Sequence, residues 1–200
     1  MLSHVDSANR PTMVDVGDKA VTRRTAVARA TVVFPADAVP ATGETLRTKK
    51  GPVFDTAIVA GVMAAKRTHD LIPFCHPIPL EDCRISIDWG GDGEVLIECS
   101  VRATHKTGVE MEALTGAATA ALTIYDMCKA LTHGIRIAEL ALVSKTGGRR
   151  DYRAAAGSAT GATPLDAAAS TAGTTAAAGQ GDVAVAAAAK PSATDAAGDD

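Results

Sequence analysis

The residues with the clearest chemical potential lie near the end of a long apolar segment, where Asp126 and Lys129 are three positions apart. In a helix, residues with this spacing project from one face, so the carboxylate and the ammonium group could act as a coupled acid/base pair. Most of their neighbours are apolar, among them Leu122, Ile124 and Met127. A charge sheltered from water needs a partner or a function. We therefore interpret the pair as catalytic, and an ion pair on a solvated helix face is the alternative.

Two further segments could bind phosphate. Lys49 and Lys50 precede a predicted helix that begins near Pro52, and ammonium groups beside the unpaired N–H groups of a helix N-terminus suit an anion. A solvated basic loop explains these lysines equally well. Farther along, His76 follows Cys75 in a connection bracketed by prolines. A fixed imidazole there could bind phosphate or transfer a proton, although a single histidine of this kind is more often structural.

The distribution of charge points to a small anionic ligand. The formal net charge is −3, but residues 154–200 carry −4, which leaves +1 for residues 1–153. A nearly neutral body does not suggest binding to nucleic acid, whereas local basic clusters suit a small polyanion. The clustered basic residues are Arg47, Lys49, Lys50, Lys66, Arg67, Lys145, Arg149 and Arg150.

Several classes of protein are not supported by the sequence. The four cysteines form no CxxC pair and the five histidines have no ligand spacing, so we predict no metal site. No Walker A loop and no GxGxxG motif is present, which argues against a P-loop nucleotidase and a Rossmann oxidoreductase. The first residues do not resemble a secretory signal, and no run approaches the roughly 18 apolar residues of a membrane span. We expect a cytoplasmic protein that contacts neither membrane nor nucleic acid.

The periodicity of apolar residues predicts the elements that must position these groups. Alternation indicates strands at 24–34 and 135–143 and a hairpin at 83–101 with its turn at 90–93, and helical spacing indicates helices at 52–67 and 108–131. Apolar residues on more than one side predict that the first helix is well buried. The order βαββαβ predicts an α+β, ferredoxin-like fold, in which a four-stranded antiparallel sheet carries two helices on one face.

The chain divides by composition into two parts. Residues 154–200 are rich in Ala, Thr and Gly, and their only larger aliphatic residues are Leu165, Val183 and Val185. Such a segment cannot build a core, so we predict a disordered tail. Residues 1–153 form the predicted catalytic domain.

Taken together, several segments closely resemble the cyclic pyranopterin monophosphate synthase family, known as MoaC. The matching segments are Met13–Val16, Lys50–Gly51, Ala64–Thr68, Leu71–Pro77, Lys106–Thr115, Leu122–Ala130 and Lys145–Gly148. Ordered runs of this length are far more specific than any isolated motif. The resemblance covers roughly His4 to Tyr152 and leaves out only the tail.

This resemblance implies a lyase of molybdenum cofactor (molybdopterin) biosynthesis. Its substrate would be (8S)-3′,8-cyclo-7,8-dihydroguanosine 5′-triphosphate, supplied by a radical S-adenosylmethionine enzyme, and its products cyclic pyranopterin monophosphate and pyrophosphate. Asp126, Lys129 and Lys50 would be catalytic. The residues implied in substrate binding are Phe74, Cys75, His76, Glu110, Met111, Glu112, Arg24, Lys66 and Lys145. No step needs redox chemistry, so no cofactor is expected, and the sequence leaves open whether Mg²⁺ accompanies the triphosphate.

Helix geometry adds an expectation about assembly. Glu112 and Asp126 are 14 residues apart, which on one helix is about 21 Å at roughly 1.5 Å per residue. Both cannot touch one small substrate, so one of them would come from a neighbouring subunit. This agrees with the homohexamer, a trimer of dimers, that the resemblance implies. The alternatives are a ferredoxin-like regulatory module that binds a nucleotide without converting it, and a purely structural assembly protein.

Overall fold

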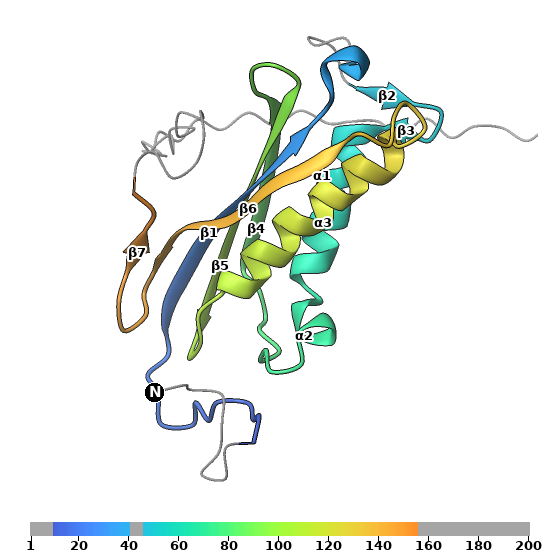
Figure 1. The fold of residues 1–200 in the computed structure, drawn as a ribbon. Helices are drawn as coiled ribbons and strands as arrows, with labels where there is room; N and C mark the ends of the chain where they lie inside the picture. The colour runs from blue at the N-terminus through green and yellow to red at the C-terminus, as the bar shows by residue number, and fades with distance from the viewer. Residues whose placement is uncertain (1–9, 41–45, 156–200) are drawn as a thin grey trace, which may run out of the picture. The chain divides into compact units, whose positions relative to one another are not determined.

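The computed structural model describes residues 10–40 and 46–155, and its main feature is a five-stranded antiparallel sheet (Figure 1). The strands are β1 (Thr22–Val33), β4 (Asp82–Trp89), β5 (Glu94–His105), β6 (Arg136–Thr146) and β7 (Tyr152–Arg153), in the spatial order β4-β5-β1-β6-β7. A separate two-stranded sheet pairs β2 (Arg47–Thr48) with β3 (Gly51–Pro52). The helices are α1 (Val53–Ala65), α2 (Thr68–Leu71) and α3 (Glu110–Cys128), with a 3-10 turn at Ala36–Ala38.

Each long element predicted from periodicity is present, and the expected mixed α/β architecture is confirmed. The prediction of four strands was too low, because β7 adds a fifth strand at the edge of the sheet and β2 and β3 form a second sheet. These extra strands have two residues each, which is too short to carry a readable alternation. The tail predicted for residues 154–200 lies, from residue 156 onward, outside the described residues.

The core lies between one face of the sheet and the two long helices. Alternate residues of β1, from Ala26 to Val32, are fully buried, as are alternate residues of β5 from Val95 to Ala103, because successive side chains of a strand point to opposite faces. Figure 1 shows α1 and α3 side by side on the sheet. Small residues on both surfaces, such as Ala30 and Ala117, allow the helices to approach closely.

The two helices come close together at Gly61 of α1 and Gly116 of α3. A Cβ atom at Gly61 would lie 2.7 Å from the carbonyl oxygen of Gly116 and in collision with Ile85 of β4. A Cβ atom at Gly116 would lie 2.7 Å from the Cys99 sulfur of β5. Both helices therefore pack on the same face of the sheet, with glycine required at their crossing.

The prediction of a well-buried first helix is wrong. The buried residues of α1 are Val53, Ala57, Gly61 and Ala65, which repeat every four positions and form a single stripe. Val59 and Met63 lie outside that stripe and are 59% and 46% exposed. Within the part of the chain that the structure describes, no helix combines the length and apolarity that crossing a membrane requires.

Candidate functional site

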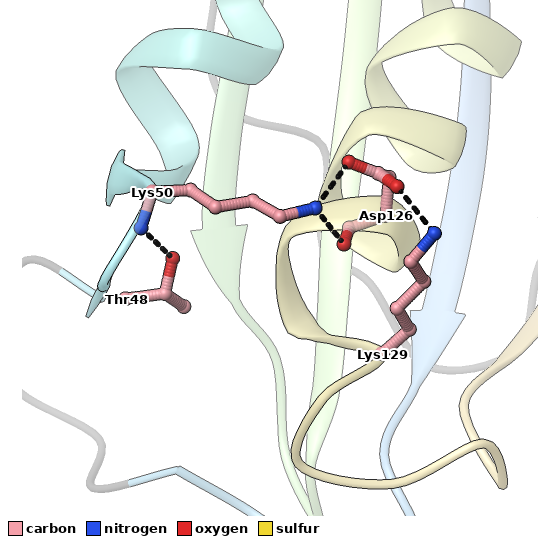
Figure 2. Close-up of polar contacts among 4 residues, drawn as sticks. All are labelled: Thr48, Lys50, Asp126 and Lys129. Atoms are coloured by element: carbon pink, nitrogen blue, oxygen red, sulfur yellow. Dashed lines mark hydrogen bonds and ion pairs between the residues drawn. The ribbon is translucent and has the colours of Figure 1, made fainter.

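Three charged side chains meet at the C-terminal end of α3 and form what we call the Asp126 cluster: Lys50, Asp126 and Lys129 (Figure 2). The ammonium group of Lys50 donates to Oδ2 of Asp126 at 2.7 Å and to its backbone carbonyl at 2.9 Å. The ammonium group of Lys129, the residue that follows α3, lies 2.8 Å from Oδ1. Lys50 comes from the turn between β2 and β3, so the fold brings together residues 76 positions apart. The three residues predicted to be catalytic are therefore neighbours in space.

The electrostatics of the cluster follow from these contacts. Hydrogen bonds from Lys129, and then from Lys50, lower the pKa of Asp126 to about 2, and Asp126 in turn raises the pKa of Lys129. The prediction of a sheltered pair is wrong for the single chain, because the Asp126 side chain is 55% exposed and both lysine side chains are 51% exposed. The apolar neighbours point elsewhere, since Ile124, Met127 and Cys128 are buried in the core. In this state Asp126 is a carboxylate that orients two ammonium groups, and those groups can bind phosphate or donate protons.

The N-terminal end of α3 borders a cavity of about 710 Å³, which we call the basic cavity. Its charged lining comprises six cations and two carboxylates: Lys19, Arg24, Lys106, Lys145, Arg149, Arg150, Glu110 and Glu112. An excess of positive charge in a concave site favours an anionic ligand. The remaining lining residues are Val14, Val16, Thr25, Phe74, Cys75, His76, Ile78, Thr107, Gly108, Met111, Thr146 and Gly148.

Almost every residue predicted to bind substrate lies in this cavity. Phe74, Cys75 and His76 reach it from the connection after α2, and residues 110–112 from the first turn of α3. Arg24 and Lys145 reach it from the adjacent strands β1 and β6. Lys66 is the exception: it is exposed at the C-terminal end of α1 and does not line the cavity.

Two cavity residues are poised for proton chemistry or recognition. Glu112 is 4% exposed, and its burial, assisted by the charge of Glu110, raises its pKa to about 7. Such a carboxyl can take up or release a proton near neutral pH. Burial and the neighbouring Glu112 raise the pKa of the Cys75 thiol, which favours a neutral thiol over a thiolate.

Two cations of the cavity, Lys145 and Arg24, are held by specific contacts. Lys145 donates to Oε1 of Glu110 at 2.7 Å. The guanidinium group of Arg24 donates to the backbone carbonyls of His105 and Lys106, each at 3.2 Å. These contacts fix the side chains before any ligand is bound, which reduces the entropy lost on binding.

The N-terminal segment also lines the cavity, although no residue of it was predicted to bind substrate and only Met13–Val16 belongs to the family resemblance. Val14, Val16 and Lys19 line the cavity. The Nε2 atom of His76 lies 2.9 Å from the carbonyl oxygen of Val14, and a carbonyl can only accept, so this nitrogen carries the hydrogen. The alternation of apolar residues around Val14 and Val16 is the only local signal that this segment lies against the body.

The Asp126 cluster and the basic cavity are separate places in one chain. Helix α3 runs unbroken from Glu110 to Cys128, so its rise of roughly 1.5 Å per residue separates residues 112 and 126 by about 21 Å. Figure 1 shows the start of α3 at the same end as α2, and its last turn near β2 and β3. Apart from Lys66, the predicted site residues thus fall into two groups that cannot meet within one subunit.

The described ranges contain no group of three or more His, Cys, Asp or Glu side chains placed to hold a metal ion.

Comparison with known proteins gives a consistent result. The model of the MoaC family matches residues 13–148. The chain is 59% identical over 155 residues to a cyclic pyranopterin monophosphate synthase of Xanthomonas axonopodis pv. citri, covering 77% of this chain and 94% of that protein. It is 46% identical over 154 residues to a protein of the same name in Bacillus thuringiensis subsp. konkukian, covering 75% and 95%. Molybdenum cofactor biosynthesis protein 1 of Dictyostelium discoideum is 47% identical over 165 residues, which is 74% of this chain and 26% of that longer protein.

Proposed function

This chain belongs to the MoaC family, and from that premise we propose that it is a lyase of molybdenum cofactor biosynthesis. It converts (8S)-3′,8-cyclo-7,8-dihydroguanosine 5′-triphosphate into cyclic pyranopterin monophosphate and pyrophosphate. The observation that carries this proposal is the family match across residues 13–148, because that range contains the Asp126 cluster and every lining residue of the basic cavity except Arg149 and Arg150.

The basic cavity suits the substrate in its charge and in its hydrogen-bonding groups. Cations of its lining such as Lys19, Arg24 and Lys145 can neutralise a triphosphate, and its two carboxylates can accept hydrogen bonds from the N–H groups of a guanine-derived ring. Among the residues predicted to bind substrate, we keep Lys66 as a phosphate contact of the assembled protein.

The reaction needs several proton transfers and the departure of pyrophosphate. Glu112, with its pKa near neutrality, is suited to proton exchange at the ring. Lys50 and Lys129 are suited to donate protons and to stabilise charge on the departing phosphate, while Asp126 holds both in place.

We propose that a complete active site forms between two subunits, one supplying the Asp126 cluster and the other the basic cavity. The 14 residues that separate these groups on α3 support this arrangement. Exposed apolar side chains, among them Leu122 of α3 and Ile137 and Leu140 of β6, provide surface for association. The proposed assembly is a homohexamer built as a trimer of dimers.

The finer fold assignment is also a proposal. Without β7, the sheet order is β4-β5-β1-β6, with α1 between β1 and β4 in the chain and α3 between β5 and β6. This arrangement supports a ferredoxin-like core for the catalytic domain, which we place at residues 1–153. We further propose that the enzyme works in the cytoplasm without a resident cofactor. Any magnesium ion would arrive with the triphosphate, whose oxygens are its preferred ligands.

The test is direct conversion of the nucleotide. The purified protein is incubated with the cyclic dihydroguanosine triphosphate, and pyrophosphate is assayed together with pterin fluorescence after oxidation. Both products should appear in equal amounts. Binding of the nucleotide without release of pyrophosphate would contradict the proposal and favour the regulatory module instead.

A further inference from the structure

The segment of residues 12–19 forms one wall of the basic cavity without belonging to either sheet. Thr12, Val14 and Val16 are half-buried, whereas Met13 and Asp15 between them are exposed. This alternation shows that one side of an extended segment lies against the body. The segment also carries Lys19, whose side chain is one of the six cations of the cavity.

Two side chains of the body hold this segment by its backbone. Nε2 of His76 donates to the carbonyl of Val14 at 2.9 Å, and the ammonium group of Lys106 donates to the carbonyl of Gly17 at 2.5 Å. The bond from Lys106 is charge-assisted, which makes it stronger than a bond between neutral groups.

The bond from Lys106 is made within a turn just before Lys19. The N–H of Gly17 donates to Oδ1 of Asp15 at 2.8 Å, and the N–H of Lys19 donates to the carbonyl of Val16 at 3.1 Å. These two bonds close a compact turn between Asp15 and Lys19. The ammonium group of Lys106 therefore binds the carbonyl of Gly17 in the middle of the turn that leads to Lys19.

Lys106 also contacts a second cation of the cavity. Its backbone carbonyl accepts a hydrogen bond from Arg24 at 3.2 Å. Lys106 thus contacts the N-terminal segment with its side chain and Arg24 of strand β1 with its backbone.

We propose that Lys106 is a positioning residue: its ammonium group fastens the turn at Gly17 and so places Lys19 where it binds the phosphates of the substrate. This inference rests on the proposed function, because it assumes that the cavity receives a triphosphate. Lys19 touches the phosphates, and Lys106 acts through Lys19.

Steady-state kinetics test the dependence of one lysine on the other. A charge-assisted contact to phosphate predicts that Lys19→Ala raises KM about tenfold or more with kcat nearly unchanged. Lys106→Ala should raise KM in the same way, and the double variant should be no worse than Lys19→Ala alone, because residues that act through one contact are not additive. Lys106→Arg keeps a cationic donor and should restore most of the loss. Effects on KM that multiply in the double variant would overturn the proposal.

Two measurements without turnover separate this inference from the proposed function. Hydrogen exchange in the substrate-free protein should accelerate about tenfold at the amides of Gly17 and Lys19 in Lys106→Ala, but not in Lys19→Ala. The affinity for inorganic triphosphate, measured by calorimetry, should fall in both variants. The matched control is Arg84→Ala, which removes an exposed cation from β4 and should change neither quantity. Unchanged exchange in Lys106→Ala would overturn the proposal even if the enzyme converts its nucleotide.

Discussion

Asp126 is held between two ammonium groups, and this arrangement sets what each of the three residues can do. Lys50 and Lys129 each lie within 2.8 Å of a different carboxylate oxygen. The carboxylate therefore stays ionised across the physiological range, with its pKa lowered to about 2. At the residue scale its function is to aim two cations, so its removal should affect chemistry far more than folding.

We expect Asp126→Asn to reduce the rate of pyrophosphate release by about 100-fold or more, because the carboxylate that aims the two proton-donating lysines is lost and proton transfer by a positioned side chain accounts for roughly that factor. The melting temperature should hardly change, because ion pairs this exposed contribute little to stability. Turnover and thermal unfolding are measured on the same preparations of Asp126→Asn and of the unsubstituted protein. Asp88→Asn, a change at an exposed position of β4, is the matched control. A variant that loses activity only because it melts earlier would contradict this interpretation.

Glu112 should make stability depend on pH. Its pKa is raised from 4.5 to about 7 in the folded protein, so the folded state binds a proton more tightly than the unfolded state between these values. This contribution to stability is complete below about pH 4.5 and is lost as the pH rises to about 7, a change on the order of 3 kcal/mol.

Glu112→Gln removes this dependence while keeping a similar shape. Urea unfolding at pH 5 and pH 8 measures this. As the pH rises, the free energy of unfolding of the unsubstituted protein should fall relative to that of Glu112→Gln. Parallel changes in the two proteins would show that Glu112 is not held in a desolvated position.

At the scale of elements, the crossing of α1 and α3 fixes the helix that connects the two halves of the proposed site. The crossing leaves no room for side chains at Gly61 and Gly116. Because α3 carries Asp126 near one end and Glu112 near the other, a shift of this helix would move both side chains together.

We expect Gly61→Ala to lower the free energy of unfolding by about 1–3 kcal/mol, the usual cost of overpacking. The change should destabilise although alanine is favoured over glycine in helices by about 1 kcal/mol. Denaturant unfolding measures the effect. Gly91→Ala is the matched control, since a Cβ atom there would meet nothing within 4 Å, and it should be nearly neutral.

At the scale of the whole molecule, each subunit carries both halves of the proposed site: the basic cavity lies at the start of α3 and the Asp126 cluster at its end. In a twofold-symmetric pair, the Asp126 cluster of one subunit would complete the basic cavity of the other, and this would occur twice. Variants defective in different halves should therefore complement each other.

Mixed oligomers of Asp126→Asn and Glu112→Ala should recover about a quarter of the normal activity, because half of randomly formed pairs contain both variants and one of their two sites is intact. The measurement is turnover of oligomers whose mixed composition is verified by two affinity tags. Mixing Asp126→Asn with Lys129→Ala is the control: both changes lie in the same cluster, so every site stays defective. No recovery in the first mixture would exclude a shared site.

The sequence alone determined the long elements and the local chemistry. Strands at β1, β4, β5 and β6 and the helices α1 and α3 follow from periodicities that repeat over many residues, so burial leaves a clear trace in the order of side chains. The pairing of Asp126 with Lys129 is equally local, since a spacing of three places both on one helix face. Family resemblance supplied the substrate and the residues implied in binding it, all of which except Lys66 line the cavity.

Only the tertiary structure decided which distant residues meet. Packing between elements far apart in the chain brings Lys50 to Asp126 and Lys106 to Gly17. It also leaves Lys66 outside the cavity. The sequence also did not reveal the exposure of Asp126, because Ile124, Met127 and Cys128 are buried on other faces of the helix and Leu122 is itself exposed. Sequence periodicity reports which face of an element is buried, whereas the partner of that face is set by how the whole chain packs.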